Sequence, residues 1–332
     1  MSPSPQSIFN TGTAEVLIVG AGIIGLSLAL ELHERGIRVQ VLERDTPLSH
    51  ASTAAAGMLA VNDPHNPAAL LPLSQLSAQL YPRWLAHIHQ LSGIAIPFQT
   101  ETTLQYQSDG NILHFSERSV EPRQLGAALL AAVRNAGIEL REHCEFHPSA
   151  APTAQTIVYA TGAWQPGSIK IPVVPRKGQM LRVQLPPSLK DLREVHRSDE
   201  VYIVPRIYGP QAGTALIGAT IEDAGFDTST HTTDLRQLRS RAARLLPVLA
   251  DETAAPMLEA WAGLRPGTPD HLPLLGAMTP GSRHFLATGH YRNGILLAPA
   301  TAVLLADLIQ DKPATLDLTP FSAARFPASF AS

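Results

Sequence analysis

The sequence lacks the features of several classes of protein. Its 332 residues include a single cysteine, Cys144, so neither an internal disulfide nor a zinc site of several thiolates can form. The apolar stretches are too short and too interrupted for a membrane-spanning helix of about 20 residues. Residues 1–15 contain neither the cationic start nor the apolar core of a signal peptide. We therefore expect a cytoplasmic protein that has no membrane partner.

Charge is also scarce, and several catalytic motifs are missing. Charged residues make up 16% of the chain, and 25 basic against 28 acidic residues give a net charge of −3. A nucleic-acid backbone attracts basic patches, so this balance predicts no nucleic-acid partner. The motifs H-E-x-x-H, G-x-x-x-x-G-K-[ST] and G-x-S-x-G do not occur. A metal site, nucleotide hydrolysis and a serine hydrolase therefore have no support in the sequence.

The chain does contain enough apolar material for two lobes. Hydrophobic residues make up 45% of the sequence, and 332 residues exceed a common single domain of about 100–200 residues. Apolar periodicity and the positions of glycine and proline predict α/β structure. We expect helices over residues 23–35, 70–90 with a break or kink at Pro82, 122–137, 235–249 and 296–309. We expect strands over residues 16–19, 37–42, 103–107, 112–115, 138–141, 156–160, 173–184, 201–205, 214–218 and 285–288.

The most specific pattern is a βαβ unit near the start of the chain. Its first strand is followed at once by G-x-G-x-x-G, which consists of Gly20, Ala21, Gly22, Ile23, Ile24 and Gly25. Gly20 allows a tight turn, Gly22 lets the backbone approach a pyrophosphate, and Gly25 allows close packing of helix on strand. The helix N-terminus adds free N–H groups and a positive dipole. This combination predicts a dinucleotide site.

The second strand of this unit ends at Glu43, where an acid accepts hydrogen bonds from a ribose diol. A carboxylate there disfavours the phosphorylated ribose of NADP and leaves NAD and FAD open. Three downstream segments favour the bulkier FAD. Residues 52–59 are small side chains, residues 156–164 contain a strand that ends in Ala-Thr-Gly, and residues 288–295 place glycines before an apolar helix.

On these motifs the sequence resembles the flavin-dependent amine and D-amino-acid oxidases, and most closely the glycine oxidases of the thiamine pathway. Residues 201–206, 261–268 and 289–299 also carry the resemblance, which spans nearly the whole chain. It implies a Rossmann-like FAD-binding domain interleaved with an α+β substrate domain built on an antiparallel sheet. The implied FAD-binding domain covers residues 12–85, 117–167 and 262–328, and the substrate domain covers residues 86–116 and 168–261.

The resemblance also implies where FAD lies. The flavin ring is expected near residues 55–59 and 292–296, and Cys144 falls in the adenosine-side part of the chain, so we expect non-covalent FAD. The residues expected to bind FAD are Gly20, Ala21, Gly22, Ile23, Ile24, Gly25, Glu43, Arg44, Ser52, Thr53, Ala55, Ala56, Gly57, Met58, Leu59, Phe146, Thr161, Gly162, Trp164, Gly289, Arg292, Asn293, Gly294, Ile295 and Leu296.

Four residues are implied to contact the substrate. An arginine suits a carboxylate because its planar fork donates two parallel hydrogen bonds. Arg265, which we expect on a turn after an apolar strand, and Tyr202 match the carboxylate-binding residues of the family. Arg292 matches an arginine close to substrate and flavin. Ile221 stands where glycine oxidase has a methionine that lines the pocket.

The implied reaction is the oxidative deamination of glycine or another small amino acid or amine. A hydride passes from Cα to flavin N5, and oxygen then accepts the electrons and yields hydrogen peroxide, so no protein acid or base is nominated. The product would be glyoxylate or an imine used to build the thiazole of thiamine. A homo-oligomer and a hand-off of the imine to a thiazole synthase stay open, as do the roles of Glu200 and His290.

Two alternatives to an oxidase stay open. One is a D-amino-acid or sarcosine dehydrogenase that passes electrons to an acceptor other than oxygen. The other is a flavin-binding sensor without turnover, against which the presence of Arg265 and Tyr202 argues.

Overall fold

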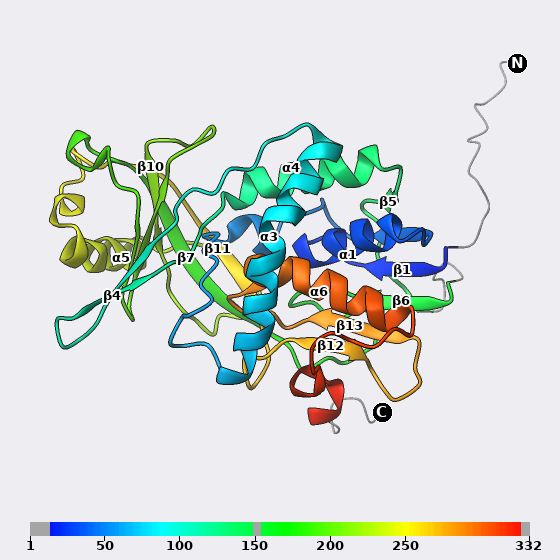
Figure 1. The fold of residues 1–332 in the computed structure, drawn as a ribbon. Coiled ribbons are helices and arrows are strands. Elements are labelled where there is room, and N and C mark those ends of the chain that lie inside the picture. The colour runs from blue at the N-terminus through cyan, green and yellow to red at the C-terminus, as the bar shows by residue number, and fades with distance from the viewer. Residues whose placement is uncertain (1–13, 149–153, 327–332) are drawn as a thin grey trace, which may run out of the picture.

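The computed structural model describes residues 14–148 and 154–326 and folds them into two lobes, each built on its own β-sheet (Figure 1). The chain passes from the first sheet to the second and back twice, so neither sheet comes from one continuous segment. The expected α/β architecture, with interleaved lobes and a largely antiparallel second sheet, is confirmed.

The first lobe contains a six-stranded sheet in the order β12-β13-β6-β1-β2-β5. Its strands are β1 (Val16–Val19), β2 (Val39–Leu42), β5 (Glu139–Arg141), β6 (Thr156–Tyr159), β12 (Leu274–Ala277) and β13 (His284–Thr288). All neighbours are parallel except β12 and β13. The central strand β1 has the sequence Val-Leu-Ile-Val and is buried throughout, as expected of a parallel strand covered on both faces.

Four helices cover one face of this sheet. They are α1 (Ile23–Glu34), α3 (Leu71–Ser92), α4 (Pro122–Asn135) and α6 (Gly294–Ile309), and a short helix α2 (Ala51–Ala54) follows β2. The helices share one apolar core with Ile18 and Val41, whereas Leu17 on the other face packs with Phe146 and Ile171. The sheet is therefore the centre of a layered lobe.

The second lobe contains a seven-stranded sheet in the order β11-β7-β10-β9-β8-β3-β4. Its strands are β3 (Thr103–Tyr106), β4 (Ile112–Phe115), β7 (Val174–Gln184), β8 (Val195–Arg197), β9 (Tyr202–Arg206), β10 (Thr214–Gly218) and β11 (Met257–Gly267). Neighbours are antiparallel except β3 and β8.

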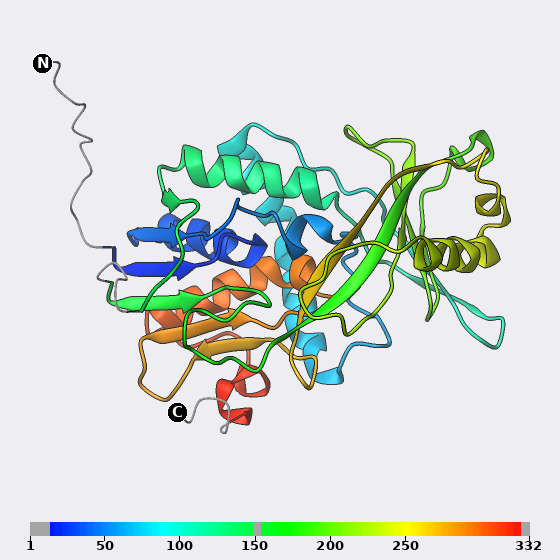
Figure 2. The ribbon, with the colours of Figure 1, turned by 180° about the vertical axis from the view of Figure 1, so that it is seen from behind.

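The two faces of the second sheet have different neighbours. Helix α5 (Thr232–Leu245) packs its Leu235 and Leu238 on one face. The other face turns toward the first lobe, where Met180 and Val204 pack with Ala56. Figure 2 shows the long strands β7 and β11 extending from the second lobe toward the first. A functional site between these strands and the β1–α1 loop would use both lobes.

One helix does not break at the proline where we expected a break or a kink. Pro82 lies inside α3, which continues unbroken to Ser92. Proline removes one backbone hydrogen bond, but α3 is fixed to α6 by two hydrogen bonds in the turns that precede Pro82. The hydroxyl of Ser77 donates to the carbonyl of Leu296, and the hydroxyl of Tyr81 donates to that of Ile295, both at 2.6 Å.

The second lobe also requires corrections. Arg265 lies inside β11 rather than on a turn, because β11 pairs with β7 through Gly267. Helix α5 ends at Leu245, and a separate 3₁₀ turn covers Pro247–Ala250, since proline cannot continue the hydrogen-bonded helix. Strands β8 and β12, of three and four residues, were not predicted.

The domain borders remain a prediction. β11 continues the second sheet to Gly267, beyond the expected border at residue 261. Residues 12, 13, 149–153, 327 and 328 of the expected ranges lie outside the described residues. None of the helices within residues 14–148 and 154–326 combines the length and the apolar character that crossing a bilayer requires.

Candidate cofactor and substrate site

The loop between β1 and α1 has the geometry that its glycines predict. Gly20 has a φ of 110°, and a Cβ atom there would lie 2.5 Å from the carbonyl oxygen of Ala160. A Cβ atom at Gly25 would collide with the carbonyl oxygen of Gly20. Side chains are therefore excluded at both positions, and the loop lies directly against the ends of β1 and β6.

The N-terminus of α1 opens on this loop without a side-chain cap. Gly22 is the N-cap residue, and the N–H of Ile23 donates to the hydroxyl of Ser52 at 2.9 Å. The next N–H groups of an α-helix have no intrahelical acceptor. These donors, together with the positive end of the helix dipole, suit a phosphate group.

Two cavities meet at this helix N-terminus. The large cavity has a volume of 210 Å³ and reaches toward the second sheet, and the small cavity has a volume of 110 Å³ and reaches toward Glu43. The residues that line both cavities are Gly22, Ala51, Ser52, Ala160 and Gly162. An elongated ligand that fills both would have its centre at the start of α1.

Glu43 lies at the small cavity with only 8% of its surface exposed. Its Oε2 accepts the N–H of Ala21 at 2.7 Å, and its Oε1 accepts the N–H of Asp45 at 2.9 Å. Each carboxylate oxygen has two acceptor positions, so these bonds leave capacity for a ribose diol. The carboxylate thus holds the glycine loop as well as facing the cavity.

Flat side chains form another wall of the small cavity. The guanidinium carbon of Arg44 lies 4.5 Å from the ring centroid of Trp164, and the His50 ring lies 4.3 Å from it. Flat side chains of this kind suit a purine base. Cys144 also lines this cavity and does not line the large one.

The large cavity is lined on one side by residues 54–58, which the second sheet holds in place. The indole N–H of Trp261 donates to the carbonyl of Ala54 at 3.1 Å, and Arg206 donates to the carbonyl of Ala56 at 2.7 Å. Burial lowers the pKa of Arg206 to about 10, so its guanidinium keeps its charge at neutral pH. Arg206 and Trp261 were not predicted as site residues, although both lie in segments that carry the family resemblance.

Residues 290–295 line another side of the large cavity. Asn293 precedes the first turn of α6, and its amide nitrogen donates to Asn66 Oδ1 at 2.9 Å. His290 is buried, and its Nε2 lies 3.1 Å from the hydroxyl of Thr301. Burial lowers the pKa of His290 to about 3, which keeps the imidazole neutral. His290 therefore packs beneath this wall as an uncharged side chain.

The structure places most of the expected cofactor residues at one of the two cavities. Those at the large cavity are Gly22, Ile23, Ile24, Ser52, Ala55, Ala56, Gly57, Met58, Gly162, Arg292, Asn293, Gly294 and Ile295, and those at the small one include Gly20, Glu43, Arg44, Phe146, Thr161 and Trp164. Six residues line neither cavity, namely Ala21, Gly25, Thr53, Leu59, Gly289 and Leu296. Leu59 and Leu296 pack into the core, and their part in binding stays a prediction.

Tyr202 and Arg265 come together in the large cavity from β9 and β11. Arg265 donates from Nη1 to the carbonyls of Thr220 at 3.1 Å and Lys177 at 3.3 Å. A Cβ atom at Gly178 would collide with this guanidinium, so only glycine leaves room for it. Burial raises the pKa of Tyr202, and the adjacent Arg265 partly offsets this shift. The phenol thus remains a donor at neutral pH.

The hydroxyl of Tyr202 has a weak partner. It donates to the sulfur of Met180 at 3.0 Å, and Met180 also lines the large cavity. A thioether is a weak acceptor, so an anionic oxygen would be a stronger partner for this hydroxyl. Sequence motifs could not identify Met180, because its role depends on the pairing of β7 with β10 and of β10 with β9.

The other two expected substrate residues lie nearer the surface of the same cavity. Ile221 is 62% exposed, and Arg292 lies with its Nη2 3.3 Å from Asp63 Oδ2. Glu200 also lines this cavity, but its carboxylate pairs with Arg244 at 2.6 Å and both side chains are largely exposed. Glu200 is therefore a solvated residue at the cavity edge.

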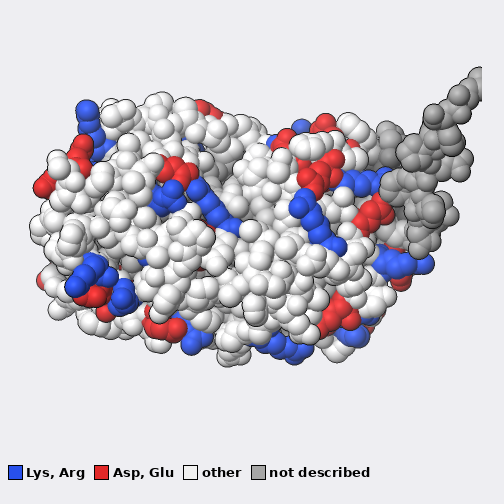
Figure 3. All heavy atoms as spheres, turned by 90° about the horizontal axis from the view of Figure 1, so that it is seen from above, with Lys and Arg blue, Asp and Glu red and all other residues white. Residues whose placement is uncertain are grey.

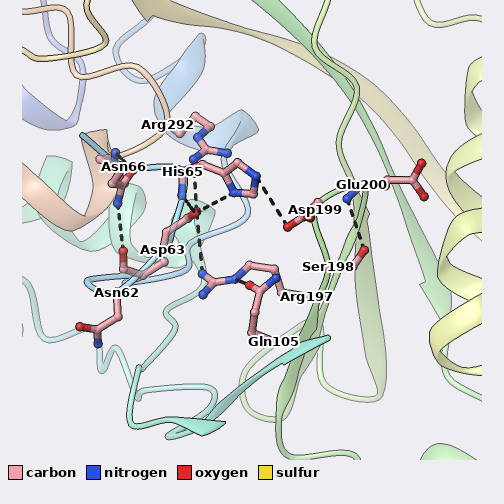
Figure 4. A network of polar contacts seen from close by, with 12 residues as sticks. Asn62, Asp63, His65, Asn66, Gln105, Arg197, Ser198, Asp199, Glu200 and Arg292 are labelled. Atoms are coloured by element: carbon pink, nitrogen blue, oxygen red, sulfur yellow. Dashed lines mark hydrogen bonds and ion pairs between the residues drawn. The ribbon is translucent and has the colours of Figure 1, made fainter. Parts of the chain in front are cut away.

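The cavity also contains a charged network that the sequence did not indicate. Figure 4 shows Asp63 between the guanidinium groups of Arg292 and Arg197, with His65 pointing toward Asp199. These residues come from three separate segments, and of them only Arg292 lies in a segment that carries the family resemblance. On the outer surface seen in Figure 3, basic and acidic side chains are interspersed, in line with the small net charge.

Within the described residues, no three His, Cys, Asp or Glu side chains are grouped so that they could hold a metal ion. The cavity walls offer helix N-termini, glycines and flat side chains instead. This donor set fits a dinucleotide, because it supplies N–H groups for phosphates and a carboxylate for a ribose.

Comparisons with known proteins agree with this geometry. The model of the DAO family, described as FAD dependent oxidoreductase, matches residues 15–112 and 101–308. A bifunctional protein ThiO/ThiG from Trichormus variabilis is 34% identical over 95% of this chain and 55% of its own length. The chain thus spans about half the length of this relative.

A glycine oxidase from Geobacillus kaustophilus matches over nearly its whole length. It is 31% identical, and the match covers 94% of this chain and 97% of the relative. The crystal structure of glycine oxidase from that organism has a TM-score of 0.86, with 30% identity over 94% of this chain and 98% of the crystallised chain.

Proposed function

The chain belongs to the DAO family of FAD-dependent oxidoreductases, and from this premise we propose that it oxidises glycine or another small amino acid at its Cα–N bond. The observation that carries this proposal is the pairing of Arg265 with Tyr202 in a cavity that also reaches the start of α1. One end of the site suits a carboxylate, and the other suits the phosphates of FAD.

FAD would lie across both cavities, with its adenosine part toward Glu43 and Trp164. Its phosphates would lie at the N-terminus of α1, and its ring would lie in the large cavity between residues 54–58 and 290–295. When bound, FAD accepts the hydride that leaves the substrate Cα. Cys144 lines the small cavity only, which supports non-covalent binding.

The protein would orient the substrate chiefly through its carboxylate. Arg265 supplies a charged donor, and Tyr202 supplies a hydroxyl that donates to the sulfur of Met180, a weak acceptor. Holding the carboxylate fixes the position of Cα, and such positioning is a large part of the rate advantage of an enzyme. The apolar neighbours Met180 and Ala56 favour the uncharged form of the substrate amine, because burial disfavours charge.

The electron acceptor and the fate of the product form a finer part of the proposal. We infer that oxygen accepts the electrons and gives hydrogen peroxide, and that the imine or glyoxylate supplies thiazole synthesis. The bifunctional relatives join ThiO and ThiG in one name, which supports a hand-off of the product to a partner enzyme.

The proposal can be tested by mixing the purified yellow protein anaerobically with glycine or sarcosine and recording its visible spectrum. Bleaching of the flavin band by either compound is the expected result, and air should then restore the colour and produce peroxide. Bleaching that is reversed by an artificial acceptor but not by air would indicate a dehydrogenase instead. A flavin band that no amino acid bleaches would overturn the proposal and favour a sensor without turnover.

A further inference from the structure

A carboxylate of the protein itself occupies a position between two arginines of the large cavity. Asp63 lies in the loop before α3, Arg197 ends β8, and Arg292 lies just before α6 (Figure 4). All three line the cavity that contains Tyr202 and Arg265. Burial raises the pKa of Tyr202, and Arg292 lies near enough for its charge to offset part of this rise, so this network and the carboxylate site are neighbours.

Asp63 is firmly held. Its Oδ2 lies 3.3 Å from Nη2 of Arg292 and 3.8 Å from Nη1 of Arg197, and its Oδ1 accepts the N–H of His65 at 2.9 Å. Only 11% of its side chain is exposed. Burial raises the pKa of Asp63, but the two arginines outweigh this and hold it below its usual value. The carboxylate is therefore ionised at neutral pH.

Both arginines have N–H groups that no acceptor of the described residues satisfies. Among the described residues, Nη1 and Nη2 of Arg197 and Nε of Arg292 are buried without a hydrogen-bond partner. Arg197 donates from Nε to Gln105 at 2.6 Å, and within residues 14–148 and 154–326 the one other acid within 4 Å of it is Glu117, at 3.6 Å. Burial raises the pKa of Glu117, which weakens it as a counter-ion. Asp63 is thus the carboxylate that lies between the two guanidinium groups, of which that of Arg197 is buried and that of Arg292 is partly exposed.

We propose that Asp63 determines substrate specificity by filling a second anion site between Arg197 and Arg292, and so restricts the substrate to one carboxylate. This inference rests on the proposed function and assigns its substrate class. A first carboxylate would bind Arg265 and Tyr202. A second carboxylate would meet Asp63 at the position where the arginines could otherwise bind it, and like charges at close range repel strongly.

Sarcosine and iminodiacetate form a matched pair of test substrates. Iminodiacetate is sarcosine with one additional carboxylate on its N-methyl carbon. In the wild-type holoenzyme, anaerobic flavin reduction should favour sarcosine. Asp63→Asn keeps the size of the side chain and removes its charge, so the ratio of kcat/KM for iminodiacetate to that for sarcosine should rise about tenfold or more. Asp63→Glu keeps the charge and should keep the wild-type preference.

Binding without turnover provides an independent measurement. Malonate and acetate have no amine and cannot be oxidised, so their dissociation constants can be followed through the spectrum of the oxidised flavin. Asp63→Asn should lower the dissociation constant of malonate about tenfold relative to that of acetate. Adding Arg197→Gln to Asp63→Asn should remove this gain, because the freed anion site then loses one cation. Asp109→Asn, an exposed change in the β3–β4 turn, should leave both ratios as they are.

The outcomes separate this inference from the proposed function. If no small amino acid reduces the wild-type flavin, the proposed function fails. If sarcosine reduces it but Asp63→Asn leaves both ratios unchanged, the anion-site inference is overturned and the function stands. If Asp63→Asn gives too little folded flavoprotein, Asp63→Ser tests the same loss of charge, and an unchanged malonate-to-acetate ratio there is equally decisive.

Discussion

The glycine loop and the substrate end of the large cavity are built in opposite ways. In the loop, backbone groups of consecutive residues 20–25 form the site, and side chains are excluded at Gly20 and Gly25. At the substrate end, side chains from β7, β9 and β11 converge with Asp63 and Arg292, which lie 229 positions apart. A backbone site leaves a short motif in the sequence, whereas a side-chain site depends on how distant strands pair.

The largest effect should come from adding a side chain to the loop. Gly25→Val would drive its Cβ into the carbonyl oxygen of Gly20 and push α1 away from β1. We expect the free energy of unfolding to fall by at least about 3 kcal/mol and bound FAD to be lost. Urea unfolding and the flavin content of the purified protein measure both effects.

Gly126→Ala is a suitable control for this substitution. Gly126 lies in α4, where an added Cβ would lie 3.1 Å from the flexible end of Leu48 and at ordinary contact distance, 3.6 Å, from the methyl group of Thr53. Its unfolding free energy should change by less than about 1 kcal/mol, and FAD should stay bound. If both variants kept FAD equally well, FAD binding would not depend on close backbone packing at the glycine loop.

A substitution at the substrate end should have a different effect from one in the loop. It should weaken substrate binding and leave FAD bound. Arg265→Met keeps much of the side-chain volume but removes the charged donors. The KM for a small amino acid should rise about tenfold to a hundredfold, because a hydrogen bond to a charged group contributes about 1.5–3 kcal/mol. Flavin content should be unchanged, and steady-state kinetics with the absorbance ratio of flavin to protein measure both quantities.

Arg176→Met is the matched control. Arg176 pairs in register with Arg265 across β7 and β11 but lines neither cavity, and its partner is Asp223. We expect near wild-type KM in this variant. An equal rise in KM for both variants would mean that substrate binding depends on positive charge in general and not on a specific carboxylate site at Arg265.

The same contrast explains what the sequence could and could not predict. Local patterns identified β1, α1, β2 and Glu43, since a parallel βαβ unit with a glycine turn leaves a continuous signature. Arg265 was expected on a turn but lies inside β11, because the length of a paired strand depends on its partner β7. Asp63, Met180 and Arg197 were missed, since only the folded sheet brings them to Tyr202 and Arg292.

A substitution at Glu43 tests whether this side chain holds the backbone of the glycine loop as well as binding the cofactor. Glu43→Gln keeps the shape but replaces a charged acceptor by a neutral one, and charge-assisted hydrogen bonds are about twice as strong. We expect about tenfold weaker FAD binding in a titration of the apoprotein with FAD. Glu139→Gln on the adjacent strand β5, where the acid pairs with exposed Arg141, is the control and should bind FAD normally.

The unfolding of the Glu43→Gln apoprotein distinguishes the two roles of this residue. The bond from the Ala21 N–H to Glu43 holds the loop even before FAD binds, so part of the loss should appear as lower apoprotein stability. If FAD affinity falls while apoprotein stability stays the same, the carboxylate acts on the cofactor alone. If neither changes, the assignment of Glu43 to the ribose is wrong.

The smallest effect should come from a contact that joins the two regions. Phe226 projects from the loop after β10, half exposed, and its ring lies 5.5 Å from that of Trp164 at the small cavity. The same loop contributes Ile221 to the large cavity and is anchored by the ion pair of buried Lys177 with Asp227 at 2.8 Å. Substrate and adenosine ends therefore share one loop.

Phe226→Ala should weaken both functions slightly and together. An aromatic pair contributes about 0.5–1.5 kcal/mol, and partial exposure favours the lower figure, so the Kd for FAD and the KM for substrate should each rise about twofold. Phe226→Leu keeps apolar contact with Trp164 and should lie between wild type and alanine in both measurements. A change in KM alone would show that the loop serves only the substrate end, and the two regions would then be independent despite their contact. A rise in both the Kd for FAD and the KM, smaller for leucine than for alanine, would show that the contact of Phe226 with Trp164 affects both ends. The cofactor site, which its glycine motif reveals, would then also depend on a side-chain contact that no motif indicates.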